Sequence, residues 1–466
     1  MVRLIFYKSY CIVHKYAKVL LGRYKLRDRF RMVDVDESDF SDCRHVSMYL
    51  GDKDQKGDLT ASFLKKEDVY PVENIVPIAS NTHLKASFTR SKSKSQKYGV
   101  VVADSSHYWE SFIRHSSIPK GYKNQGMHYA GYIADRNGGW CLPSWIWTNA
   151  ALVKYYCFSG DYEEARRIAG LLQNLQMPCG GWVVRDDYSN MGPTPIVAPN
   201  DSAYIANNAF LELYKKTKDE KYLDIAVNCA DWIISVARPD GLVFTGYNAT
   251  SGEWLTKHII VDIGFTAALF ANIYEITNEK RYKIFLDKFI DRYISLFYVE
   301  NDSGFATSID SNNRAVGGMF ARGQAWALEG LIPAYRISKS TVLAKVIDDT
   351  VKTIISNQLP NGGWSYNFKK PMLGEDCKGV PIIAKSLLDW NDYFPSDEII
   401  RAGFGALNWC REHTQIDGDG KGGIFSFNME GAMVHNLYTA TAFVYSSAYA
   451  IELETSMKKY EHDYCY

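Results

Sequence analysis

A pair of helices that recurs at a nearly constant interval is the feature that most constrains the fold of this chain. Each unit has an apolar helix, a short polar turn, an amphipathic helix and a glycine-rich turn with an aromatic residue, as in DSAYIANNAFLELYKKT, KDEKY, LDIAVNCADWIISVA and RPDGLVFTGY. The six apolar helices begin near positions 144, 201, 262, 322, 378 and 438, so their starts are almost evenly spaced. Such periodicity indicates one architecture assembled from a single supersecondary unit.

The two kinds of helix predict a double ring. The first helix of each unit is apolar nearly all round, so we expect it to be buried on several sides. The second has apolar residues at intervals of three and four with charges between them, so one of its sides should face solvent. Stacked superhelical repeats are the alternative, but their periods are usually shorter, about 34–47 residues, and they do not need one helix of each pair wholly buried. The sequence therefore predicts an all-α fold, an (α/α)6 toroid of six helical hairpins.

The repeat divides the chain into two expected parts, an N-terminal extension over residues 1–106 and the six-hairpin barrel over residues 107–466. The extension contains polar loops such as TRSKSKSQK, and its beginning, residues 1–31, carries nine Lys and Arg among many apolar residues. That segment could touch an anionic membrane surface or a partner, whereas a helix or strand that caps the barrel is the structural alternative. No run is long and apolar enough for a transmembrane helix, and none resembles a cleaved signal peptide.

Composition narrows the range of functions. The formal net charge is zero, with 53 basic and 53 acidic residues, which argues against nucleic-acid binding. A short acidic oligosaccharide remains compatible, because one or two arginines can hold one carboxylate. The nine cysteines are scattered without a CxxC motif, which favours a reducing, cytoplasmic location. No cluster has the spacing of metal ligands, so neither a metal nor an organic cofactor is expected.

The predicted barrel places the functional site at one of its ends. All six inner helices should run in the same direction, so their N-termini converge on one mouth, which the glycine-aromatic turns surround. Residues in the first turns of these helices then meet in space although a whole hairpin repeat separates them in sequence. Helix N-termini carry partial positive charge and free N–H groups, which suit an acidic or hydroxyl-rich ligand.

Asp201 and Asp262 occupy equivalent first-turn positions on successive inner helices. A facing pair of carboxyl groups can carry out general acid/base chemistry on a sugar when one is kept protonated and the other stays ionised. The plain alternative is that both are helix N-caps, a position that Asp favours. Asp201 follows Pro-Asn and fits a cap well, whereas Asp262 follows the apolar run Ile-Ile-Val and is a poorer cap.

The fourth inner helix opens with MFARGQAWALEGL. Arg322 could clamp a substrate carboxylate in bidentate fashion, and Trp326 lies one turn along on the same side. An arginine paired to a neighbouring acid is the commoner alternative. Trp145 and Trp147 fit sugar stacking and core packing equally well. Two further tryptophans lie in QMPCGGW and QLPNGGW and are predicted to tie helix ends together, namely Trp182 and Trp364.

The run ARGQAWAL at residues 321–328 resembles the signature of the unsaturated glucuronyl hydrolases, glycoside hydrolase family 88, and less closely that of family 105. In those families two essential aspartates precede this run, one in a His-Asp dipeptide that opens an inner helix and one in an (I/V)(I/V)D run one hairpin later. Here Asn200-Asp201 and Ile260-Val261-Asp262 stand in the same order, also one hairpin apart. The resemblance covers roughly residues 140–450.

The resemblance implies Asp262 as general acid/base and Asp201 as its carboxylate partner. The residues expected to bind substrate are Arg322, Trp326, Gln324, Asn200, Phe320, Trp145 and Trp147. The implied reaction is hydration of the C4=C5 double bond of an unsaturated uronyl residue at the end of an acidic oligosaccharide, without a cofactor. Asn200 stands where the family has His, Phe320 where Trp is usual, and the histidine-rich stretch before the arginine is missing.

Two other functions remain open on the sequence. One is a polysaccharide lyase or epimerase built on the same barrel, for which a Tyr, His and Arg constellation would be needed. The other is a non-catalytic glycan-binding protein of a polysaccharide biosynthesis pathway, a role that would explain why the family's histidines are missing.

Overall fold

The computed structural model describes residues 105–122, 124–134, 139–140, 144–186, 196–255, 258–370, 374–376, 378–416, 418, 420–427 and 440–461. Nearly all of them belong to one compact unit formed by Gly99–Ile133, Gly138–Phe427 and Thr441–Tyr466. A second unit comprises Met1–Tyr98, Ala134–Asn137 and Asn428–Ala440. The predicted N-terminal extension, including its basic segment, lies outside the described residues except for residues 105 and 106.

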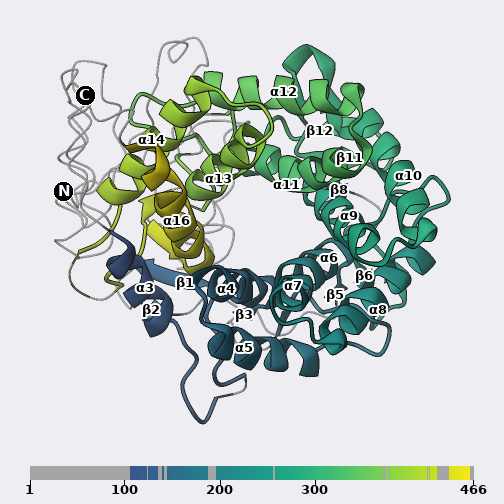
Figure 1. Cartoon of the computed structure of the whole chain (residues 1–466), viewed down its shortest axis with the longest axis horizontal. Helices are drawn as coiled ribbons and strands as arrows, with labels where there is room; N and C mark the ends of the chain where they lie inside the picture. Colours follow the sequence, from purple (N-terminus) through teal and green to yellow (C-terminus); the bar gives the residue numbers. More distant parts are fainter. Residues whose placement is uncertain are drawn as a thin grey trace, which may run out of the picture. The chain divides into compact units, whose positions relative to one another are not determined.

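The main unit is a double ring of helices, as predicted (Figure 1). The inner ring consists of α4 (Ile146–Ser159), α6 (Pro199–Ile205), α9 (Phe265–Thr277), α11 (Ala321–Ser338), α13 (Val380–Asn391) and α16 (Val444–Met457). The outer ring consists of α5 (Tyr162–Asn174), α8 (Glu220–Val236), α10 (Lys280–Phe297), α12 (Thr341–Ser356), α14 (Asp397–Glu412) and α3 (Ser106–His115). Each inner helix contacts the next, and α16 contacts α4, so the ring is closed.

Two inner elements depart from a plain α-helix. The second inner helix continues from α6 through the π-helix η5 (Ala206–Leu211) into α7 (Glu212–Thr217). The third begins with the 3-10 helix η6 (Val261–Gly264) before α9. The last inner helix starts at Val444 rather than near residue 438, because strand β14 (Ala440–Phe443) precedes it. The sixth outer helix, α3, comes from before the repeat and packs against α16.

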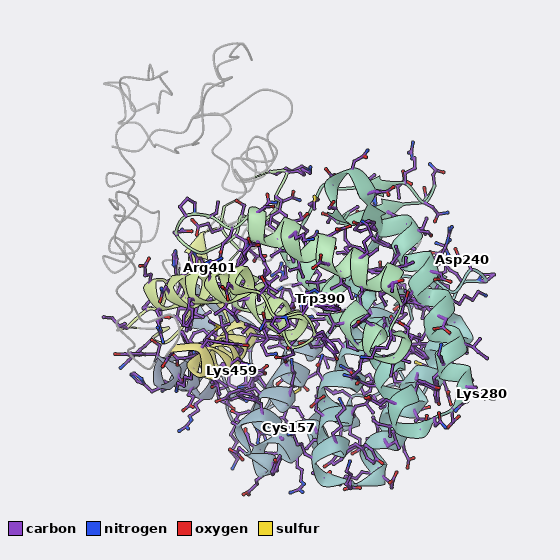
Figure 2. The ribbon with its side chains drawn as sticks, turned by 45° about the horizontal axis from the view of Figure 1, so that its top comes forward. Cys157, Asp240, Lys280, Trp390, Arg401 and Lys459 are labelled. Atoms are coloured by element: carbon purple, nitrogen blue, oxygen red, sulfur yellow. The ribbon has the colours of Figure 1, made fainter. Side chains whose placement is uncertain are left out.

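Burial follows the apolar pattern of each helix. In α9 every residue from Phe265 to Ile273 is buried, so only the last turn of this helix, which includes the exposed Glu275, meets solvent. In α10 the buried residues recur at intervals of three and four, while the charges between them face outward. In Figure 2 the side chain of Trp390 from α13 lies inside the ribbon, whereas Lys280 at the start of α10 lies at its outer edge. Each large side chain removed from water in this way contributes about 1.5–3 kcal/mol.

Four of the turns from inner to outer helices are short because their first residue takes a left-handed conformation, whereas residues 392–396 form a longer turn between α13 and α14. The φ angles at these C-caps lie between 51° and 85°, at Gly160, Lys218, Asn278 and Lys339. The next residue starts the outer helix: Asp161 caps α5 by accepting a hydrogen bond from the Glu164 N–H, and Ser340 caps α12 in the same way. These two-residue connections reverse the chain and set the hairpin geometry.

The turns from outer to inner helices are longer and carry short antiparallel strands. β3 (Ser144–Trp145) pairs with β4 (Arg185–Asp186), and β9 (Tyr298–Val299) with β10 (Gly304–Phe305). Three-stranded sheets are formed by β5 (Ile196–Val197), β6 (Tyr247–Asn248) and β7 (Glu253–Trp254), and by β8 (His258–Ile260), β11 (Ser308–Asp310) and β12 (Ala315–Val316). A four-stranded sheet has the order β13 (Ser426–Phe427), β14, β1 (Gly131–Ala134), β2 (Gly139–Trp140). These strands hold the segments that lead into the inner helices.

The QMPCGGW and QLPNGGW turns tie helices together, as predicted for their tryptophans. Trp182 and Trp364 are fully buried, and each indole N–H donates to a main-chain carbonyl of the preceding outer helix at 2.8 Å. The glutamine of each motif adds a second tie: the Gln358 amide donates both to Gly362 in its own turn and to Ala402 of α14, each at 2.9 Å. Within the described residues, none of the helices is long and apolar enough to cross a membrane.

Candidate active site

The two aspartates lie inside the first turns of their helices and are not N-caps. The N-cap of α6 is Ala198, and Asp201 is the third residue of that helix. The N-cap of η6 is Ile260, and Asp262 follows it by two positions. Neither carboxylate caps its own helix by the usual side-chain hydrogen bond, so the plain N-cap interpretation does not explain their presence.

Strand pairing and a tyrosine fix the backbone beside Asp262. The Val261 N–H donates to the Thr307 carbonyl at 3.0 Å, which extends the pairing of β8 with β11. The Val261 carbonyl accepts a hydrogen bond from the Tyr293 hydroxyl of α10 at 2.7 Å. Both main-chain groups before Asp262 are thus held, and its carboxyl group is presented from a rigid support.

The structure brings the two carboxyl groups into one site, where both aspartates are half-buried. Burial raises the pKa of Asp262 to about 6, against the opposing effects of a hydrogen bond from Asn200, its own backbone N–H, and the charges of Lys378 and Arg322. Burial and the charge of Asp262 raise the pKa of Asp201 well above its ordinary value, and only Lys378 opposes this. Both pKa values are raised, so the pair retains a proton at higher pH than a free carboxyl group would.

Asn200 bridges the pair. Its side chain is 3% exposed, and its amide nitrogen lies 3.4 Å from Asp201 Oδ1 while also supporting Asp262. In the described part of the chain, the buried Oδ1 atoms of Asn200 and Asp262 have no hydrogen-bond partner. Buried acceptors of this kind are rare, and a sugar hydroxyl could satisfy both of them.

Arg322 lies at the same mouth but is already paired with an acid. Its side chain is 1% exposed, its Nη1 lies 3.6 Å from Asp376 Oδ1, and its guanidinium lies over the rings of Phe320 and Trp326 at 4.7 and 5.1 Å. Asp376 is fully buried and also accepts a hydrogen bond from the Gly379 N–H at 3.1 Å. The guanidinium therefore connects α11 to the segment before α13, and a substrate carboxylate would have to compete with Asp376 for it.

Gln324, one of the substrate contacts predicted from sequence, uses both ends of its amide for main-chain hydrogen bonds. Its Oε1 accepts from the Phe305 N–H at 2.7 Å, and its Nε2 donates to the carbonyls of Phe305 and Phe320 at 2.8 and 3.1 Å. The side chain is fully buried. Its amide holds β10 against α11, because it gives the Phe305 N–H and C=O the hydrogen bonds that a neighbouring strand would otherwise supply.

Aromatic rings form a continuous belt at the level of the first two helical turns. Neighbouring centroids lie 4.7–6.3 Å apart along the series Tyr445, Trp147, Tyr204, Phe265, Trp326, Phe320 and Tyr366. The belt thus includes Trp147, Trp326 and Phe320, three of the predicted sugar contacts. Flat ring faces beside buried acids suit the apolar C–H faces of pyranose rings.

Lys378 is the site residue that the sequence interpretation missed. It is 4% exposed, and its ammonium lies 4.4 Å from the Trp145 ring centroid and 4.9 Å from that of Trp147. These two predicted sugar contacts therefore also hold a lysine. The signal was available, since the repeat predicted a start of the fifth inner helix near residue 378, although Lys378 lies two residues before α13 and not within its first turn.

A second polar cluster lies deeper in the ring. The Tyr204 and Tyr449 hydroxyls are 3.1 Å apart, and the Tyr449 hydroxyl donates to Glu329 at 2.9 Å. Burial raises the pKa of Glu329 to about 7. Lys154 and Glu452 pair beside it at 3.7 Å. Nowhere in the described ranges do three or more His, Cys, Asp or Glu side chains gather so as to hold a metal ion.

Three of the solved structures that this chain resembles are those of carbohydrate-active enzymes. An unsaturated glucuronyl hydrolase specific for heparin matches with a TM-score of 0.60 at 16% identity, over 77% of this chain and 97% of the other. A family 76 α-mannanase from Bacteroides thetaiotaomicron matches with a TM-score of 0.57 at 14% identity, over 77% and 96%. A cellobiose 2-epimerase from Bacillus thermoamylovorans matches with a TM-score of 0.60 at 12% identity, over 75% and 95%. The chain has the fold of the six-hairpin (α/α)6 glycosidases, which confirms the resemblance at that level.

A sequence family within this fold also matches part of the chain. The family model of glycosyl hydrolase family 76 matches residues 202–389. That stretch includes Asp262, Arg322 and Lys378 and begins directly after Asp201. A search of curated protein sequences finds no match.

Proposed function

We propose that the protein is a glycoside hydrolase-like enzyme that processes an oligosaccharide through Asp262 and Asp201. The observation that carries this proposal is the half-buried pair of carboxyl groups from successive inner helices, both with raised pKa values, at the level of a belt of aromatic rings. Such pairs allow one group to donate a proton while the other carries charge. A structural role would not need two buried acids within electrostatic reach of each other, because isolating them from water is costly.

The substrate class that we infer first is an oligosaccharide ending in an unsaturated uronyl residue. Protonated Asp262 would give its proton to C4 of the C4=C5 double bond. A water molecule would add its oxygen at C5 and pass a proton to the Asp262 carboxylate, which restores the acid. The resulting hemiketal opens and releases the rest of the sugar. The ARGQAW run and the fold shared with an unsaturated glucuronyl hydrolase support this choice.

Hydrolysis of a neutral α-mannan is a second candidate. The match of residues 202–389 to family 76 favours it. The charge balance also allows a neutral sugar, because Asp376 pairs with Arg322 and Lys378 offsets the single negative charge of a pair that holds one proton. Asp262 would then protonate a glycosidic oxygen instead of a carbon atom.

A substrate panel tests both candidates. The protein is incubated with unsaturated disaccharides from chondroitin, heparin, alginate-type and pectin-type lyase digests, and loss of the ultraviolet absorbance of the double bond is followed. α-Mannan oligosaccharides run in parallel, with products separated by chromatography. We expect turnover in one arm and none in the same arm with Asp262→Asn. Absence of turnover in every arm would leave the glycan-binding alternative and contradict an enzyme of this class.

A further inference from the structure

Lys378 lies in a cage of four aromatic rings. Its Nζ is 4.4–5.6 Å from the ring centroids of Trp145, Trp147, Phe443 and Tyr445. These rings come from the beginnings of α4 and α16, whereas Lys378 precedes α13. The ammonium therefore crosses the mouth from one inner helix toward two others. Ring faces attract a cation electrostatically, which offsets part of the cost of removing the charge from water.

The backbone beside the lysine is held as firmly as its side chain. The buried Ser446 hydroxyl donates to the Lys378 carbonyl at 3.2 Å. The Gly379 N–H donates to the Asp376 carbonyl and to its Oδ1. A Cβ added at Gly379 would lie 2.6 Å from Asp376 Oδ2 and 3.3 Å from the Arg322 Cβ, so a larger residue does not fit there. A fixed backbone and a caged side chain together give a charge of fixed position.

The lysine charge acts on both acids. Its ammonium stabilises the ionised forms of both Asp201 and Asp262. Among the described residues, it is the one cation found to act on Asp201, since Arg322 acts on Asp262 but not on Asp201. Other charged or titratable groups that face this site from the surrounding elements are Arg322 of α11, Asp376 before α13, Tyr293 of α10 and Tyr445 of α16.

We propose that Lys378, caged by four aromatic rings at the mouth, is a positioning residue that holds one negative charge on the aspartate pair and so sets the pH range in which the site works. This inference rests on the proposed acid/base role of Asp262. With Lys378 in place the pair keeps one proton and one charge. Without Lys378, none of the described cations would offset the rise that burial causes in the pKa of Asp201, and the pair would bind its protons more tightly.

The test compares Lys378→Met, which fills the cage without charge, with Lys378→Arg, which keeps the charge. Lys369→Met is the matched control, because Lys369 also precedes α13 but is exposed and pairs with Asp302. Carboxyl carbons of the aspartates are titrated by NMR and assigned with Asp201→Asn and Asp262→Asn. We expect Lys378→Met to raise the lower apparent pKa of the pair by about one unit, a tenfold change in acid strength. Lys378→Arg and Lys369→Met should stay close to the wild type.

The outcomes separate this inference from the proposed function. A folded Lys378→Met protein whose aspartates titrate as in the wild type would overturn the positioning role, whatever its effect on tryptophan fluorescence or stability. If Lys378→Met does not fold, Lys378→Gln replaces it in the same titration. A shifted titration in a protein without turnover on any sugar supports the lysine role but contradicts the proposed enzyme. Where turnover exists, the pH dependence of kcat/KM must move to higher pH by the same amount.

Discussion

An acid/base catalyst works best when its pKa lies near the pH of its surroundings, and Asp262 meets this condition through burial. Its pKa is about 6 because desolvation outweighs the Asn200 hydrogen bond and the two nearby cations. The protonated form is the proton donor in the proposed reaction. Activity that depends on it should therefore be present below this pKa and decline as the pH rises through it.

We accordingly expect kcat/KM to be level below about pH 6 and to fall about tenfold per pH unit above it. The measurement is a pH profile of initial rates on the substrate that the panel identifies, with stability checked at each pH. A profile that stays level up to pH 8 would show that Asp262 is not the proton donor.

For single residues, the sequence could predict which first-turn side chains lie near one another, but not which counterions or rings each of them contacts. Asp201, Asp262 and Arg322 follow from the regular hairpin repeat and the common direction of the inner helices. The counterion Asp376 lies in an irregular segment before α13, where no periodicity indicates a direction. The Lys378 cage depends on rings from α4 and α16, which lie far from it in sequence and beside it only once the ring closes.

Helix α11 has two functions that its sequence does not separate. One of its sides carries Arg322 to the site, while Gln324 holds β10 through the Phe305 backbone. In a motif such as ARGQAW both polar residues look like ligand contacts. In the structure Gln324 forms hydrogen bonds with the main chain of Phe305. Phe305 belongs to a two-residue strand, which is too short to show a recognisable sequence pattern.

Gln324→Ala tests this division. It would leave the buried Phe305 N–H and C=O without their partner, and we expect a loss of about 2 kcal/mol in the free energy of unfolding. Urea denaturation measures it, with Gln173→Ala on the exposed side of α5 as the control that should change little. A stable variant with weakened sugar binding would instead restore Gln324 as a substrate contact.

The double ring as a whole was predictable because it follows from alternating burial, and the helix pattern is the strongest signal in the chain. The origin of its sixth outer helix was not. The sixth outer helix, α3, precedes the repeat, and its first N–H groups are capped from α16: Ser105 and Ser106 donate to the Glu454 carboxylate at 3.2 and 3.0 Å. Glu454 also pairs with Arg411 of α14 at 2.6 Å. Contacts between segments near opposite ends of the chain leave no local signature.

Glu454 is therefore expected to matter more for stability than any surface acid. Glu454→Ala leaves Arg411 largely buried without this partner and uncaps α3, so we expect about 3 kcal/mol of destabilisation. Glu412→Ala, next to Arg411 but exposed, is the control. Thermal or urea unfolding distinguishes them, and equal stability of the two variants would show that α3 does not depend on Glu454.

The most direct test of the account is the turnover of oligosaccharide by the wild type, Asp262→Asn and Asp201→Asn under identical conditions. We predict that Asp262→Asn lowers kcat by at least about a hundredfold, that Asp201→Asn lowers it as well, and that both variants remain folded and still bind the sugar. Turnover by Asp262→Asn at a rate close to the wild type would contradict the claim that this carboxyl group carries the chemistry.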